Sequence, residues 1–553
     1  MKYSIGIDFG SLSGRCVLVN VANGDVVATT VSEYAHAVMD RQLPDGTTLP
    51  LDWALQDPQD YIDVLFQTIP AVLHDAKIEG KDVIGIGIDF TGCTVLPLDS
   101  TGTPLCFLPQ FASNPHAYVK LWKHHASQPE ADLINQIATE RKETFLNRYG
   151  GKISSEWLFP KLLQILHDDP ELYKAIDCFI EAADWITFFL SGNMTRNYCS
   201  LGFKAMWHPK KGFPSSDFFK ALDPRFEHVV QEKIKGKSVP VATKIGTLRP
   251  SLANQLGLSP NTCVSSGHFD ASCSLMGAGI SQIGSMLAVV GTSICHMLLG
   301  KKEQYVPGIC GCVEGGFIPG LLGYEAGQSS VGDQFQWLVE NCIPPKYIAE
   351  AERQKKTLYQ YLGELAFSKP VGANGLLALD WWNGNRSILV DGKLSGLLIG
   401  CTLQTQVEDM YRALVEATAF GTRMIVENFE KKGIPVEQFY CSGGIARKDS
   451  FMMQTYADVL GMDIHIIETK ENAALSASIC GALAAAENHG YSSFHEAIEH
   501  MSHTSSKTYR YNLHNKVIYD ELYSEYCKLY EYFGKGINPV MKKLKKIAEA
   551  EKK

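Results

Sequence analysis

The sequence lacks the features that would place the chain in a membrane or on nucleic acid. No apolar run reaches the roughly 18 residues that span a bilayer. The N-terminal segment lacks the long apolar stretch of a secretory signal. The formal net charge is −9, which argues against a nucleic-acid partner. We therefore expect a cytoplasmic protein with neither a membrane nor a nucleic-acid partner.

Paired cysteine motifs are also missing. The fifteen cysteines are an odd number, are scattered through apolar segments and include no pair separated by two residues. Cysteines that hold zinc or form the disulfides of secreted domains usually recur at regular spacings. We expect reduced thiols and no cysteine metal site.

The length predicts more than one domain. The 553 residues exceed the ~250 to 300 at which a single core stops growing. We place the boundary near residue 280, which gives domains at 1–280 and 281–553. In the first, residues 110–235 are rich in helical patterns and aromatic residues, and predict an insertion that builds a pocket. In the second, we expect a helical tail from about residue 490.

Strands and helices alternate along the chain, which predicts an α/β fold. A helix is expected from Pro58 with Asp57 as its cap, followed by a β-branched strand over 83–89. The second half repeats this order, with a helix over 407–427 and a strand over 438–441, and an Ala-rich helix over 473–486 has side chains small enough to predict close packing on a sheet. Such alternation is typical of sheets covered by helices.

Two segments far apart predict the same hairpin, in which a buried strand enters a turn of small residues and returns as a second strand. The first turn contains Gly10, Ser11, Ser13 and Arg15, and the second contains Gly291, Thr292 and Ser293. Glycine lets backbone N–H groups approach phosphate oxygens, and hydroxyls add neutral donors. Either turn alone could be an ordinary tight β-turn. The pair favours a clamp for a nucleoside triphosphate between two domains.

Asp8 lies at the first of these turns. A carboxylate repels phosphate unless a divalent cation stands between them, so Asp8 predicts a Mg²⁺ site.

The residues identify a resemblance to the FGGY carbohydrate kinases. It is carried by Asp8-Phe9-Gly10-Ser11, Asp270, Gly291-Thr292-Ser293 and Ser442-Gly443-Gly444-Ile445-Ala446-Arg447-Lys448. Within the family, the resemblance is to the members that phosphorylate ribulose, and it spans residues 1 to about 490. Five further segments carry it: Leu121-Trp122-Lys123, Ser154-Ser155-Glu156-Trp157, Gly308-Ile309-Cys310-Gly311, Glu325-Ala326-Gly327-Gln328-Ser329 and Leu379-Asp380-Trp381-Trp382-Asn383-Gly384.

The resemblance implies two actin-like (ribonuclease H-like) ATPase domains around a central catalytic cleft. It implies transfer of the γ-phosphate of MgATP to the C5 hydroxyl of L-ribulose, with D-ribulose as a further substrate, in L-arabinose catabolism. Its partners are then ribulose and ATP, and a homodimer is left open as the assembly. The implied site residues are Asp270 as catalytic base, Gly92, Lys204 and Glu325 for the sugar, and Gly443, Gly444 and Lys448 for ATP.

Each of these roles has a plainer alternative. Asp270 precedes small residues and could simply cap a helix, Lys204 lies between apolar neighbours and could extend to solvent, and Gly443-Gly444 could be a turn before the next helix. For the whole chain, the alternatives are another pentulose kinase such as a xylulokinase, an actin- or Hsp70-like ATPase switch, and a sugar sensor without catalysis. The switch is disfavoured because no pattern of a peptide-binding β-domain or lid follows the second half. The sensor would be expected to lose Asp8 or Asp270, and both are present.

Overall fold

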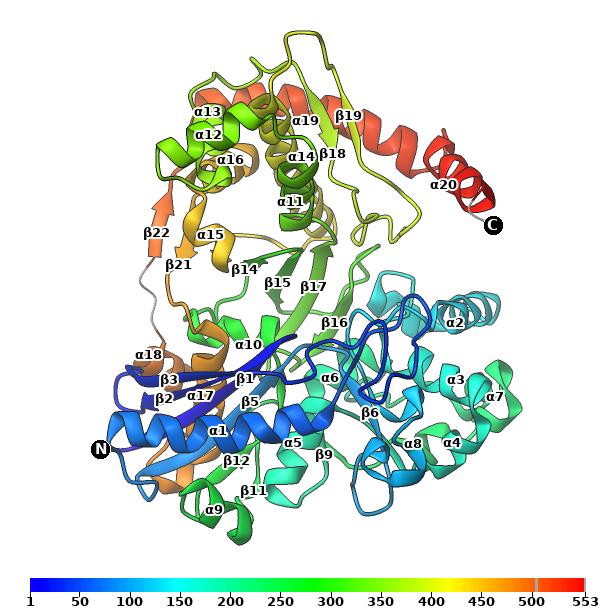
Figure 1. The fold of residues 1–553 in the computed structure, drawn as a ribbon, viewed down its shortest axis with the longest axis vertical. Helices are drawn as coiled ribbons and strands as arrows, with labels where there is room; N and C mark the ends of the chain where they lie inside the picture. Colours follow the sequence, from blue (N-terminus) through cyan, green and yellow to red (C-terminus); the bar gives the residue numbers. More distant parts are fainter. Residues whose placement is uncertain (503–505, 552–553) are drawn as a thin grey trace.

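The computed structural model describes residues 1–502 and 506–551, which form two lobes, each built around a seven-stranded sheet (Figure 1). The first sheet has the order β11-β12-β5-β1-β2-β3, with β13 beside β5. Its strands are β1 (Tyr3–Phe9), β2 (Ser13–Asn20), β3 (Val26–Glu33), β5 (Val83–Phe90), β11 (Lys244–Thr247), β12 (Cys263–Ser265) and β13 (His268–Phe269). The second sheet has the order β16-β17-β15-β14-β20-β21-β22. Its strands are β14 (Ser285–Val290), β15 (Ile294–Gly300), β16 (Gly311–Glu314), β17 (Leu322–Gln328), β20 (Gln438–Ser442), β21 (Ile464–Ile467) and β22 (Ser506–Tyr509).

The two sheets share one connectivity. β1 pairs antiparallel with β2 and parallel with β5, and β14 pairs antiparallel with β15 and parallel with β20. Both predicted hairpins are therefore present at the centre of their sheets. The expected duplication of an α/β unit is confirmed.

Helix α17 (Asn472–Ala484) comes from the second half of the chain but packs on the first sheet, across β1 and β5. Close approach is possible because glycines line those strands. A Cβ at Gly6 would lie 1.8 Å from the carbonyl oxygen of Ala474, and one at Gly87 would lie 1.7 Å from that of Ala477. The small side chains predicted for this segment thus allow backbone-to-backbone packing. On the other face of the sheet lies α1 (Pro58–Ala76), which Asp57 caps as expected.

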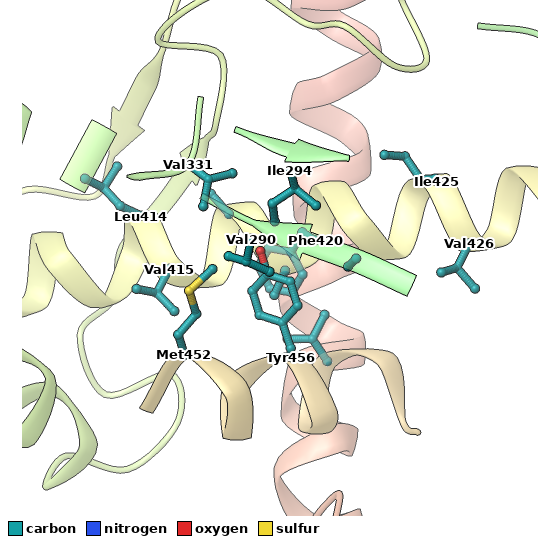
Figure 2. Close-up of a cluster of buried hydrophobic side chains, with 14 of the residues drawn as sticks. Val290, Ile294, Val331, Leu414, Val415, Phe420, Ile425, Val426, Met452 and Tyr456 are labelled. Atoms are coloured by element: carbon teal, nitrogen blue, oxygen red, sulfur yellow. The ribbon is translucent and has the colours of Figure 1, made fainter. Parts of the chain in front are cut away.

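The second lobe has a core between its sheet and three helices, α14 (Val407–Glu430), α16 (Ser450–Leu460) and α19 (Leu513–Gly534). Figure 2 shows Val415 and Phe420 of α14 facing Met452 and Tyr456 of α16, beside Val290 of β14. The predicted helical tail contributes to this core through the tyrosines of α19. After α19 comes α20 (Val540–Glu551), and the last two residues of the basic tail lie outside the described residues.

The predicted insertion forms its own aromatic-rich core beside the first sheet. Its core is built from a four-stranded sheet in the order β4-β7-β6-β8 and six helices, namely α2 (Gln128–Glu140), α3 (Leu158–Asp168), α4 (Pro170–Ala175), α6 (Tyr198–Lys204), α7 (Ser216–Leu222) and α8 (Val229–Lys233). A seventh helix in this range, α5 (Ala182–Ser191), packs in the core of the first sheet instead. The strands are β4 (Leu55–Gln56), β6 (Val95–Leu98), β7 (Val119–Lys120) and β8 (Cys178–Glu181). Met39, Trp53 and Val95 also belong to this core, so the structural unit is wider than residues 110–235.

Helix α10 (Asp270–Gly277) leads from the first lobe to the second, and the predicted boundary near residue 280 falls between it and β14. A further core cluster joins the lobes here and includes Val17 of β2, Leu275 of α10, Ile479 of α17 and Leu287 of β14. Of the helices in the described residues, none is both long enough and apolar enough to cross a membrane.

Candidate functional site

The first phosphate turn is held in shape by contacts from outside it. The N–H of Gly10 donates to the carbonyl of Ser13 at 2.9 Å and closes the turn. The Gln56 side chain donates to the carbonyl of Ser11 at 2.8 Å, and the indole N–H of Trp122 donates to the Ser11 hydroxyl at 3.0 Å. Trp122 belongs to the insertion, so the insertion supports the turn directly. Arg15 follows on β2, where its backbone pairs with that of Asp8.

The second turn lies against Gly443-Gly444, the segment predicted to bind the adenosine part of ATP. The N–H of Gly291 donates to the carbonyl of Ser293 at 2.9 Å, and the N–H of Val331 donates to the carbonyl of Thr292 at 2.8 Å. Gly443 has a φ of 103°, and a Cβ there would lie 2.3 Å from the carbonyl oxygen of Val290, which ends β14. This position therefore requires glycine because both conformation and space exclude a side chain.

Gly444 and Lys448 begin and end the short helix α15 (Gly444–Lys448), and both are exposed. A Cβ on Gly444 would meet open space. The backbone here is thus accessible to a ligand, as the adenosine prediction requires.

Asp270 is the first residue of α10 and is half-buried. One carboxylate oxygen accepts the N–H of Ala271 at 2.6 Å, so the plainer role at the helix start is present too. Burial and the charge of Asp8 raise the pKa of Asp270 to about 7. A carboxyl with a pKa near neutrality is suited to accept a proton during a reaction.

Sequence reasoning missed Asp89, which is fully buried at the end of β5 directly beside Asp8. Burial, followed by the charges of Asp8 and Asp270, raises its pKa well above the usual range. Its carboxyl has no hydrogen-bond partner in the described residues other than the carboxyl of Asp8. A signal was available: Ile-Gly-Ile-Asp-Phe occurs at both 5–9 and 86–90, and the two copies pair in register on adjacent parallel strands.

The predicted sugar residues Lys204 and Glu325 meet across the two lobes. Lys204 ends α6 in the insertion and donates to both carboxylate oxygens of Glu325 on β17, at 2.9 and 3.0 Å. Burial alone would lower the pKa of Lys204, but the adjacent Glu325 raises it, so the lysine stays charged. The alternative in which Lys204 extends to solvent does not hold, because its side chain is only 9% exposed. Both residues lie in the electrostatic field of Asp270.

Gly92 lies in the loop after β5, where a Cβ would crowd the ring of Phe269 at 3.2 Å. The loop is fixed by the buried Lys161, a residue that sequence reasoning did not single out. Its ammonium group donates to the carbonyls of Cys93 at 2.6 Å and Leu121 at 2.9 Å. Gly92 is thereby held next to Asp270, which follows Phe269 in the chain.

Comparison with known proteins assigns this architecture to a family. The model of the N-terminal domain of the FGGY family of carbohydrate kinases matches residues 3–277, and that of the C-terminal domain matches residues 286–485. The chain belongs to the FGGY family. This FGGY kinase is 52% identical to a ribulokinase of Bacillus licheniformis, over 97% of each chain. It is 46% identical to a ribulokinase of Mycolicibacterium smegmatis, over 98% of this chain and 96% of the relative.

Solved structures of sugar kinases share the fold of this FGGY kinase. A ligand-bound xylulose kinase from Lactobacillus acidophilus superposes with a TM-score of 0.77 at 19% identity, and covers 96% of this chain and 98% of its own. A gluconate kinase from the same organism gives 0.78 at 19% identity, covering 97% and 99%. The predicted two-domain fold is confirmed, and the protein is an ATP-dependent carbohydrate kinase. This excludes the ATPase switch and the sugar sensor.

Proposed function

We propose that this kinase is a ribulokinase, which transfers the γ-phosphoryl group of ATP to the C5 hydroxyl of L-ribulose, with D-ribulose as a further substrate, in L-arabinose catabolism. The relatives named ribulokinase match the chain at about half of all positions over nearly its full length. The observation that carries the proposal is the grouping of Asp270, Lys204 and Glu325. This grouping supports the proposal, because a carboxyl that can act as a base lies near a charged pair that can bind sugar hydroxyls.

In this proposal, Asp270 accepts the proton of the C5 hydroxyl as the oxygen attacks the γ-phosphorus. Phosphoryl transfer depends mainly on positioning and charge stabilisation. The base therefore accepts the proton late, and the two turns contribute most of the catalysis. The turns at Gly10-Ser11 and Gly291-Thr292-Ser293 donate to the phosphates. Lys204 and Glu325 orient the sugar, because an ammonium donates to hydroxyl oxygens and a carboxylate accepts from hydroxyl protons.

A magnesium ion fits the carboxylates of the first lobe. Asp8 and Asp89 are neighbours on β1 and β5, and within the described part of the chain no donor stabilises the charge of Asp89. In the described residues, no three acidic, histidine or cysteine side chains form an all-protein cage. Mg²⁺ in kinases usually takes only one or two carboxylates and completes its shell with phosphates and water. Asp8 would hold the ion with Asp89 behind it, and the ion would neutralise charge on the phosphates.

We expect Asp8→Asn to weaken binding of the metal much more than binding of the sugar. The carboxylate is proposed to meet the cation and its waters, so losing its charge should raise the Mg²⁺ concentration for half-maximal activity by ~10-fold or more. Binding of Mn²⁺ with ATP, followed by electron paramagnetic resonance, measures the same effect without turnover. Asp25→Asn, at an exposed aspartate after β2, is the matched control. Unchanged metal titrations would remove Asp8 from the site.

A panel of sugars tests the proposed substrate. L-ribulose should be phosphorylated with a kcat/KM at least ~10-fold above those for D-xylulose, glycerol and hexoses, a margin that one or two matched hydroxyl contacts supply. ADP release with each sugar gives the ratios. A panel in which D-xylulose is a good substrate and L-ribulose a poor one would replace the proposal with a xylulokinase.

Placement in the cytoplasm and assembly as a homodimer also remain part of this proposal. Both are inferred from the resemblance to ribulokinases, and neither affects the mechanism proposed for the site.

A further inference from the structure

Four charged side chains meet where the two lobes come together, and each lobe supplies one cation and one anion. The first lobe provides Glu156, just before α3, and Lys204. The second provides Glu325 and Arg386, which lies between β18 (Leu377–Leu379) and β19 (Leu397–Ile399). One pair is Lys204 with Glu325, described above. The other joins the Arg386 guanidinium to a Glu156 carboxylate oxygen at 3.4 Å.

The two pairs form one electrostatic cluster. Burial alone would raise the pKa of Glu156, but Arg386, His125 and Lys204 together hold it below its usual range. Arg386 in turn lies in the field of both Glu156 and Glu325. Since Asp270 lies in the field of Glu325 and Lys204, the Lys204–Glu325 pair acts electrostatically on both the base and the Glu156–Arg386 pair.

Arg386 is held in place by the strand that carries Glu325. The N–H of Ser387 donates to the carbonyl of Gly327 at 3.1 Å, and the N–H of Gly327 donates to the Ser387 hydroxyl at 3.2 Å. The Arg386 side chain crosses Gly327, where a Cβ would lie 3.1 Å from its Cδ. Glycine at 327 therefore leaves room for the arginine to lie along β17 toward Glu156.

The segment that carries Arg386 also contacts the helical tail, through Asp380. The Asp380 carboxylate accepts from Gln328 of β17 at 2.8 Å and from the hydroxyl of Tyr526 of α19 at 3.0 Å. The tail lies beyond the residues that match the family model, which end at 485. The segment from Asp380 to Ser387 is thus held at its start by α19 and β17 and at its end by β17.

The Glu156–Arg386 pair is not saturated by protein contacts. A guanidinium has five N–H donors, and within the described residues Arg386 uses one of them, toward Glu156. The side chains of Arg386 and Glu156 are 24% and 18% exposed, so both remain accessible to a ligand. A cation and a carboxylate side by side match neighbouring hydroxyls, which accept from one and donate to the other.

We propose that Glu156 and Arg386 are substrate-positioning residues that bind the hydroxyls of the ketopentose at the end away from the phosphorylated carbon. This inference rests on the proposed function. Because the pair joins the two lobes, a sugar long enough to reach it favours contact between them. A three-carbon acceptor bound next to Asp270 would not reach so far, so the pair sets specificity for the longer sugar.

The test compares Glu156→Gln and Arg386→Gln with wild-type enzyme, using L-ribulose and ATP as the varied substrates. Each variant should raise KM for L-ribulose by ~10-fold or more and leave KM for ATP within about twofold, the mark of a lost sugar contact. The double variant should cost less than the product of the two single effects, because the residues act as one pair. Arg386→Lys keeps the positive charge but loses the planar array of guanidinium N–H donors, and should give a KM for L-ribulose between those of wild type and Arg386→Gln.

Lys210 and Glu314 provide the matched control, since they also form an ion pair between the lobes, at 2.7 Å, but with side chains 72% and 42% exposed. Glu314→Gln and Lys210→Met should leave KM for both substrates unchanged. The inference is overturned if the Glu156 and Arg386 variants behave like these controls, or if they raise both KM values equally. If Arg386→Gln does not fold, Glu156→Gln and Arg386→Lys decide the question alone. Wild-type enzyme inactive on L-ribulose would overturn the proposed function instead, and the same comparison would then use D-xylulose.

Discussion

Asp270→Asn is expected to lower kcat by ~10²-fold or more while KM for sugar and ATP changes little, because general-base and positioning effects of this size act in the transition state. Asparagine keeps the shape of the side chain, and its amide oxygen can still accept the N–H of Ala271. Helix α10 should therefore start as before. What is lost is the carboxylate oxygen that we propose to accept the proton of the sugar hydroxyl. Steady-state release of ADP with L-ribulose measures the effect.

Asp217→Asn separates this role from a general effect of aspartate at a helix start. Asp217 lies in the first turn of α7 and is exposed. Its replacement should leave kcat unchanged. Turnover of the Asp270 variant within a few-fold of wild type would assign Asp270 to helix capping alone.

The same residue predicts the pH dependence of the reaction. Burial and Asp8 raise the pKa of Asp270 from 3.8 to about 7 in the free protein, so the carboxyl takes up a proton as the pH falls through that value. The protonated acid cannot act as a base. We expect kcat/KM for the sugar to fall on the acid side of about pH 7, and the Asp270→Asn variant to lose this limb of the profile.

Lys204→Met is expected to raise KM for L-ribulose by ~10- to 100-fold, since a hydrogen bond to a charged group contributes about 1.5 to 3 kcal/mol. The substitution also leaves Glu325 without its cation between the lobes. Breaking a buried ion pair on one side typically costs ~3 to 5 kcal/mol. Because Glu325 is still 17% exposed, we expect a smaller loss of stability here, and the main loss in sugar affinity.

Two measurements keep the effects of Lys204→Met apart. Thermal unfolding without ligands reports stability, and KM for ATP reports the nucleotide site, which should change by no more than about twofold. Lys174→Met removes an exposed lysine that pairs with Glu171 and serves as the control. If KM for the sugar stays at the wild-type value, Lys204 is a structural residue and the sugar site must be placed elsewhere.

Features that depend on residues close together in the sequence were predictable from it. The hairpins at Gly10-Ser11 and Gly291-Thr292 follow from turn chemistry between apolar strands, and both are present. The Ala-rich segment around Ala477 predicted close packing, and α17 does pack closely. That α17 packs on the first sheet was not predictable, because the sequence of a helix does not show which distant glycines will contact it.

Other residues were missed or misjudged from the sequence alone. Asp89 repeats the context of Asp8 and could have been found from the repeated pentapeptide. Trp381 carried part of the resemblance used to assign substrate specificity, yet it is fully buried in the second core against Tyr530. Arg386, five positions further on, pairs with Glu156 and is the residue of this segment that we propose to contact the sugar.

By itself, the sequence determined the α/β class and the duplicated hairpin turns, and it predicted Asp270 as the base and Lys204 and Glu325 as sugar residues, because turn chemistry, strand patterns and family motifs are contained in short segments. Only the tertiary structure decided which charges meet. Glu156 and Arg386 are 230 residues apart in the chain, and each alone resembles an ordinary polar residue beside a helix or in a loop. Their pairing arises because the two lobes bring together the segment before α3 and the segment between β18 and β19, and long-range packing of this kind leaves no pattern in either segment.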